Sequence, residues 1–262
     1  KKTTRVAKFV DSILKVFPSG WFKAFLSKDV KIFLRDPLQW SHFLVFFGIL
    51  FIYIINLRTF SYHLLNLVWK NLVVFLNTFA TCAVLASLGT RFIYPQLSLE
   101  GLNYWILGLS PVSLFKILWE KFILSFLFCL FISESLIILS NIMVKSSPLI
   151  FYTSCVIVFW ATVSITSICI GLGAYFADFT KKHHFEVISE FGGLVALIVS
   201  LVYIIGVVFS TGALIHFYII GKISSDITTS INVSLGIIGF VSIIISSLCL
   251  GMGVRSLKLK EF

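Results

Sequence analysis

The sequence predicts an all-α membrane protein with six transmembrane helices, an N-terminal interfacial amphipathic helix and a cytoplasmic helix between spans two and three. Of its 262 residues, 58% are hydrophobic, 12% are charged and 28 are Phe. A soluble domain of this length has no core large enough to bury so many apolar side chains. The bilayer must therefore surround much of the chain, and the distribution of its cations then orients the spans.

Six apolar stretches reach the length of about 20 residues that a transmembrane helix needs. They cover residues 38–57, 67–88, 122–144, 149–176, 193–220 and 231–252. With both termini in the cytoplasm, 17 of the 21 Lys and Arg residues lie on inner segments, as the positive-inside rule requires. The sequence therefore predicts a multi-pass protein of the cytoplasmic (inner) membrane. Its net charge of +10 then needs no nucleic acid as a partner.

Residues 1–37 form a cytoplasmic segment that we separate from a transmembrane domain at 38–262. Within this segment, the helix predicted at 21–35 ends at Asp36-Pro37, because proline disfavours helical geometry in the residue before it. Apolar residues cover a wide arc of this helix. Its cations cluster on the other side, at Lys28, Lys31 and Arg35. Such a helix lies in the membrane interface with its basic face toward lipid phosphates or the cytoplasm. The alternative is a soluble helix on an adjoining domain.

A connector at residues 91–121 lies between spans two and three. It neither spans the bilayer nor has the composition of a solvated loop. It carries charges, a proline near each end of its central part, and two Trp residues typical of the membrane interface, Trp105 and Trp119. We therefore expect the connector to couple the membrane part to a partner in the cytoplasm.

Two spans carry small residues at steps of three and four, which places these residues on one face of each helix. They are Ser164, Ser167, Gly171 and Ala174 in span four, and Gly239, Ser242, Ser246, Cys249 and Gly253 in and just after span six. Another helix can approach closely along each face, so we expect tight packing there. The five cysteines all lie in apolar runs without a CxxC pair, which predicts buried thiols rather than a metal or a disulfide.

Glu134 is the one acidic residue deep in a predicted span, about midway between Lys121 and Lys145. An ionised carboxylate at this depth costs about 3 kcal/mol or more, so it must face a polar cavity, find a partner or be protonated. Two interpretations stay open. Glu134 lines a substrate path or takes part in proton movement, or it is a neutral, hydrogen-bonded packing residue.

No catalytic motif is present, since the sequence lacks the phosphate loop GxxxxGK(S/T) and the motifs HExxH and GxSxG. The adjacent His183 and His184 point in different directions from a helix and have no third metal ligand at matching spacing. We therefore predict no catalytic, cofactor-binding or metal-binding residue, and a protein that is not itself an enzyme. The alternatives are a secondary transporter or channel, which only Glu134 favours, and, with less support, an intramembrane enzyme.

Several short runs carry a resemblance to a known family. They are FLRDP at 33–37, LEG at 99–101, WIL at 105–107, SPVS at 110–113 and KIL at 116–118. The segment at 173–193, with Asp178 and the pair Gly192-Gly193, fits the connector between spans four and five. In this order they resemble the membrane-spanning subunits of ATP-binding-cassette (ABC) transporters of the type-2 exporter class. The resemblance covers the whole chain as one six-span half.

The resemblance implies a permease subunit, embedded in membrane lipids, that forms half of a translocation pathway. ATP hydrolysis then takes place on a partner ABC ATPase, and the connector contains a coupling helix that docks on it. The positions expected to serve this contact are Arg91, Glu100, Trp105, Pro111 and Lys116. For Glu100, capping of a helix is an equally good interpretation.

The second half of the pathway is expected from a homodimer, a sister subunit or an upstream half of the same parent chain. Because the first residue is Lys1 rather than Met, we expect the sequence to be a piece of a longer or processed polypeptide. In this class the outer end of span five often carries short re-entrant helices. Ser210-Thr211-Gly212 is therefore expected to break that span, so that residues 213–220 turn back.

Overall fold

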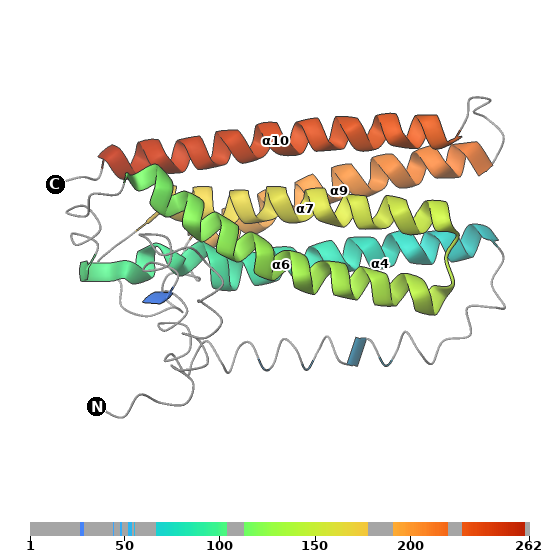
Figure 1. Ribbon diagram of the computed structural model, residues 1–262, viewed down its shortest axis with the longest axis horizontal. Coiled ribbons are helices and arrows are strands. Elements are labelled where there is room, and N and C mark those ends of the chain that lie inside the picture. Colours follow the sequence, from blue (N-terminus) through green and yellow to red (C-terminus); the bar gives the residue numbers. More distant parts are fainter. Residues whose placement is uncertain are drawn as a thin grey trace.

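The computed structural model describes residues 27–28, 44, 48, 52–53, 55, 67–103, 113–177, 191–219 and 227–259. These residues form helices and no strand. The long helices are α4 (Leu67–Leu88), α6 (Leu114–Val144), α7 (Pro148–Tyr175), α9 (Phe191–Ile219) and α10 (Ile227–Leu259). Figure 1 shows that they lie side by side in one elongated bundle.

Within the described residues, five helices are long and apolar enough to cross a membrane. At about 1.5 Å per residue, even the 22 residues of α4 match the thickness of the hydrocarbon core, about 30 Å. Over the described residues, the prediction of an all-α fold with helices long and apolar enough to cross a membrane is therefore confirmed. The first predicted span at 38–57 and the amphipathic helix at 21–35 lie mostly outside the described residues, so both stay predictions.

The bounds of α4, α7 and α9 lie close to the predicted spans, whereas α6 and α10 are longer than expected. α6 begins at Leu114 instead of residue 122, because Ser113 has the extended backbone of an N-cap residue (φ −63°, ψ 144°). The N–H of Lys116 then donates to the Ser113 carbonyl (2.9 Å). The helix thus starts as soon as the SPV sequence allows it, and not where the apolar run begins.

The helices alternate in direction, so the bundle has two distinct ends. We call the end where α4 and α7 finish and α6 and α9 start the connector end, and the other one the opposite end. At the opposite end a short turn joins α6 to α7, and Lys145 adopts the left-handed conformation there (φ 53°). The N–H of Lys145 donates to carbonyls of the last turn of α6, which closes that helix.

The centre of the bundle is α7, which packs against α4, α6, α9 and α10. Its most extensive contact is with α10. A Cβ atom on Gly171 would overlap the backbone of Cys249, and one on Gly253 would lie 3.0 Å from the Cβ of Ala174. The two faces of small residues are therefore confirmed as packing faces, and the structure shows that they pack on each other.

The predicted break in span five is wrong, since α9 runs without interruption from Phe191 to Ile219. The hydroxyl groups of Ser210 and Thr211 both donate to the carbonyl of Val207, at 3.0 and 2.9 Å. These polar groups are thus satisfied inside the helix and do not interrupt it. Gly212 leaves room for the ring of Phe75 on α4, 3.7 Å from a Cβ placed there.

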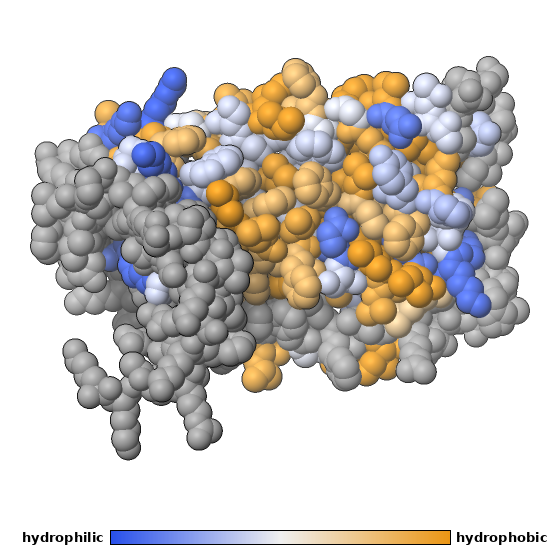
Figure 2. Space-filling view, viewed as in Figure 1, coloured by the Kyte–Doolittle hydropathy of each residue, from blue (hydrophilic) through white to orange (hydrophobic). Residues whose placement is uncertain are grey.

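Hydrophobic side chains cover most of the middle of the face visible in Figure 2. On α9 and α10, large apolar side chains that are more than half exposed include Leu194, Val202, Phe209, Phe240 and Leu248. A soluble protein does not leave so many large apolar groups in water, whereas lipid tails contact them favourably. The surface of the bundle therefore agrees with its assignment to a membrane.

Candidate functional site

The first part of the connector is helical. α4 passes into a π-helical turn, η3 (Gly89–Ile93), and then into two 3₁₀ segments, η4 (Tyr94–Gln96) and η5 (Ser98–Asn103). Pro95, which is buried, stands in the first turn of η4, where its missing N–H costs no helical hydrogen bond. The predicted contact residues Trp105 and Pro111 lie outside the described residues.

Glu100 lies at the centre of a cluster of three charges. The ammonium group of Lys28 donates to both of its carboxylate oxygens, each at 2.7 Å, and Lys121 donates to Oε1 at 3.0 Å. The side chains of Glu100 and Lys121 are 8% and 4% exposed, while that of Lys28 is 33% exposed. We call these residues the Glu100 cluster. It joins the N-terminal segment, the connector and the beginning of α6.

The charges in this cluster support one another. Burial alone would raise the pKa of the Glu100 carboxyl, but the ammonium groups of Lys121 and Lys28 outweigh it and hold the pKa below its usual value. Glu100 therefore stays ionised at neutral pH. A buried carboxylate that receives charge-assisted hydrogen bonds from two sides fixes the positions of both donors.

The Glu100 cluster changes the expected role of its members. Glu100 contacts the chain's own cations, Lys28 and Lys121, and the ammonium group of Lys28 points to Glu100. Arg91, in η3, and Lys116, in the first turn of α6, are both exposed. Among the predicted ATPase-contact positions that the structure describes, Arg91 and Lys116 present their side chains at the surface of the connector end.

Tyr94 fastens the connector on its other side. Its side chain is only 1% exposed and lies between the end of α7 and the beginning of α9. A Cβ atom on Gly173 would overlap the Tyr94 carbonyl, and one on Gly192 would overlap the Tyr94 hydroxyl. Gln96 adds a hydrogen bond from its amide to the hydroxyl of Ser125 on α6 (3.2 Å). The connector is thus packed against three spans, α6, α7 and α9.

Glu134 lies apart from the connector, on α6 within the bundle. It is half-buried and lies close to Cys155 on α7. The adjacent Ser133 and Thr162 of α7 hydrogen-bond to each other through their hydroxyls (3.1 Å). Glu134 is thus placed against α7 and stays partly accessible, and both interpretations of its role stay predictions.

Several residues of the site were missed by sequence reasoning. Glu120 is 0% exposed and Lys121 is 3% exposed, although both were assigned to a cytoplasmic connector. Their burial could have been predicted from their position in the amphipathic start of α6, between Leu118 and Phe122, both of which are buried. Tyr94 was also missed. Gly173 and Gly192 had been noted only as part of a family pattern, and nothing in the sequence pairs them with a tyrosine about 80 residues or more away.

The fold and the connector define a multi-span helical membrane protein in which a structured segment ties several spans together at one end. The family model described as "Putative ATP-binding cassette" matches residues 1–262. The chain therefore belongs to this ABC-related family. It matches no curated protein and no solved structure. Among the described residues, no group of three or more His, Cys, Asp or Glu side chains is arranged to hold a metal ion.

Proposed function

We propose that this chain is the permease half of an ABC exporter in the cytoplasmic membrane. In this proposal it forms half of a translocation pathway, and a second half comes from another copy, a sister subunit or an upstream part of the parent chain. ATP is hydrolysed on a separate partner ATPase, in keeping with the absence of a phosphate loop from this sequence. The connector end faces the cytoplasm, where most cations of the sequence fall.

The observation that carries this proposal is the attachment of the connector. The Glu100 cluster ties it to α6 and to the N-terminal segment, and Tyr94 ties it to α7 and α9. A force applied to the exposed side of the connector therefore reaches three spans through packed contacts rather than through a flexible loop. Coupling to a nucleotide-driven partner needs an element of this kind.

The test is capture of the ATPase by the full chain. We expect an ATPase with a phosphate loop to co-purify with the tagged chain from native membranes. Arg91→Glu, which reverses an exposed charge on the connector, is expected to weaken this capture about tenfold. Lys145→Glu reverses an exposed charge at the opposite end and serves as the matched control, which should bind the ATPase like the wild type.

Transport measured in the same membranes separates this function from its main alternative. Transport by an exporter of this kind requires ATP, and it stops when the ATPase is removed. The proposal is contradicted if an ion gradient alone drives transport and neither the wild type nor Lys145→Glu captures an ATPase. That result favours a secondary transporter.

A further inference from the structure

The start of α6 and the end of α10 meet at the connector end. The two helices contact each other, and Figure 1 shows that they lie together there and diverge toward the opposite end, with α7 between them. Their exposed residues at this point are Phe115, Lys116 and Trp119 on α6 and Arg255 and Lys258 on α10. We call these five residues the α6–α10 patch.

Three cations of the patch come from two different helices. Lys116 lies in the first turn of α6, and Arg255 and Lys258 lie in the last two turns of α10. Figure 2 shows hydrophilic side chains gathered over the end of α10 and the start of α6, at the upper left. The hydroxyl of Ser256 donates to the carbonyl of Tyr175 at the end of α7 (3.2 Å). This bond helps to hold the last turns of α10 on the bundle, so the cations stand on a fixed support.

Aromatic rings continue the patch along α6 toward the middle of the bundle. Phe115 and Trp119 are 55% and 43% exposed, and their rings stack with centroids 6.1 Å apart. The series goes on through Phe122 and Phe126 to Phe159 of α7, with successive centroids 5.3, 5.8 and 6.0 Å apart. An exposed Trp beside cations is typical of the depth at which lipid headgroups meet lipid tails.

The end of α10 shows the same change from apolar to charged side chains. With 33 residues, α10 is about 50 Å long and exceeds the hydrocarbon core of a bilayer, which is about 30 Å thick. Leu248 and Met252 are large, apolar and exposed, and Arg255 and Lys258 follow them within two turns. Long cationic side chains at such a boundary place their charges among the lipid phosphates, while the apolar groups contact the tails.

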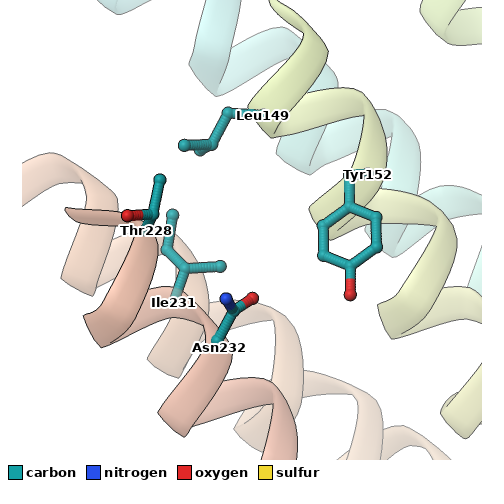
Figure 3. Close-up of a pocket in the computed structure, with 5 residues that line it drawn as sticks. All are labelled: Leu149, Tyr152, Thr228, Ile231 and Asn232. Atoms are coloured by element: carbon teal, nitrogen blue, oxygen red, sulfur yellow. The ribbon is translucent and has the colours of Figure 1, made fainter.

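A cavity at the opposite end of α7 and α10 offers a different chemistry. It measures 340 Å³ and lies between the starts of the two helices. Figure 3 shows Leu149 and Tyr152 of α7 on one side of it and Thr228, Ile231 and Asn232 of α10 on the other. These five residues supply apolar and hydrogen-bonding groups but no charge. An anionic headgroup therefore finds complementary charges at the α6–α10 patch and not on the described lining of this cavity.

We propose that the α6–α10 patch binds an anionic phospholipid. The headgroup phosphate lies beside the cations of the two helices, and the acyl chains extend along the exposed rings of α6 and the apolar side chains of α10. Arg255 suits this role because a guanidinium group can donate to two phosphate oxygens at once. A phospholipid fits better than a soluble anion because apolar groups adjoin the cations. The inference goes beyond the proposed function, since it requires neither the ATPase nor transport.

The test measures lipid binding to the purified full chain by native mass spectrometry. The probes are dioleoylphosphatidylglycerol and dioleoylphosphatidylcholine, which share the phosphate and the acyl chains and differ in net charge. Each cation near the lipid phosphates is worth about fivefold in affinity for an anionic lipid. We therefore expect the wild type to bind phosphatidylglycerol at least about tenfold more tightly than phosphatidylcholine. Equal binding of the two lipids overturns the proposal.

Two double variants show where this preference arises. Arg255→Gln with Lys258→Gln removes both cations of α10 and should abolish most of the preference, while phosphatidylcholine binds as before. Lys70→Gln with Lys145→Gln removes two cations at the opposite end and is the matched control. It should keep the preference of the wild type. If the two double variants lose the preference equally, the net charge of the chain and not the patch selects the lipid, which overturns the proposal.

Two further measurements separate the phospholipid from other anionic partners. A large excess of glycerol phosphate, which has the charge of a headgroup without acyl chains, should not displace the bound lipid. Displacement would make the patch a site for soluble anions and overturn the proposal. It is also overturned if Arg255→Gln with Lys258→Gln keeps the lipid preference but no longer captures the ATPase, because the patch is then a protein-docking surface. None of these outcomes decides the permease function, since lipid binding is measured without the ATPase.

Discussion

Replacing Glu100 by lysine is expected to cause a large loss of stability. The change removes the only anion of the Glu100 cluster and places a third cation beside Lys121, which is 4% exposed. Breaking a buried ion pair by losing one partner costs about 3–5 kcal/mol. We therefore expect the connector to detach from the start of α6, with a large fall in the thermal unfolding temperature of the purified chain.

Two further variants show whether this effect belongs to the cluster. The double variant Glu100→Lys/Lys121→Glu exchanges the two charges, so that a cation at position 100 again faces an anion at position 121. We expect this variant to recover part of the stability that Glu100→Lys loses. Arg91→Glu changes charge by the same amount on an exposed part of the connector, and should alter the free energy of unfolding by no more than about 0.5 kcal/mol. If Arg91→Glu destabilises the chain as much as Glu100→Lys does, the cluster has no special role.

Gly171→Ala is expected to separate the two most extensively packed helices. The new methyl group would overlap the backbone carbonyl of Cys249 on α10, and a backbone group cannot rotate away as a flexible side chain can. Overpacking of this kind costs about 1–3 kcal/mol. Unfolding of the full chain by a denaturing detergent, followed by circular dichroism, should show the loss as a transition at lower detergent concentration.

The same substitution at Gly236 is the matched control. Gly236 lies in α10 and has no atom within 4 Å of the position where a Cβ would be placed. Since alanine favours a helix over glycine by about 1 kcal/mol, Gly236→Ala should leave the chain unchanged or make it slightly more stable. Opposite signs for the two substitutions are therefore expected. A similar effect at both sites would contradict the close approach of α7 and α10.

The spans could be predicted from the sequence because hydrophobic length is a local property. Runs of about 20 apolar residues located α4, α7 and α9 closely, and steps of three and four between small residues found the faces on which α7 and α10 meet. The predicted span at 122–144 lies inside α6 but does not mark where the helix starts, because an apolar run and a helix begin at different residues. The helix begins at its cap, Ser113, while the apolar run begins only at Phe122.

The candidate site depends on contacts that no local pattern encodes. Lys28 and Glu100 are 72 positions apart, and only the folded chain brings them together. Counting charges placed both on the same side of the membrane but gave no reason to pair them. The same holds for Tyr94, whose environment is made by glycines at the ends of two other helices. For Glu134 the sequence identified the residue, and the structure placed it close to Cys155.

The 3₁₀ geometry of η5 also has a mechanical consequence. A 3₁₀ helix rises about 2.0 Å per residue and an α-helix about 1.5 Å, so the 6 residues of η5 are about 3 Å longer than they would be in α-helical form. Stretches of 3₁₀ helix beyond three or four residues are uncommon because their hydrogen bonds are poorer. A change of Ser98–Asn103 from 3₁₀ to α-helical form would therefore shorten the segment and shift one of its ends by about 3 Å along its axis, with no hinge.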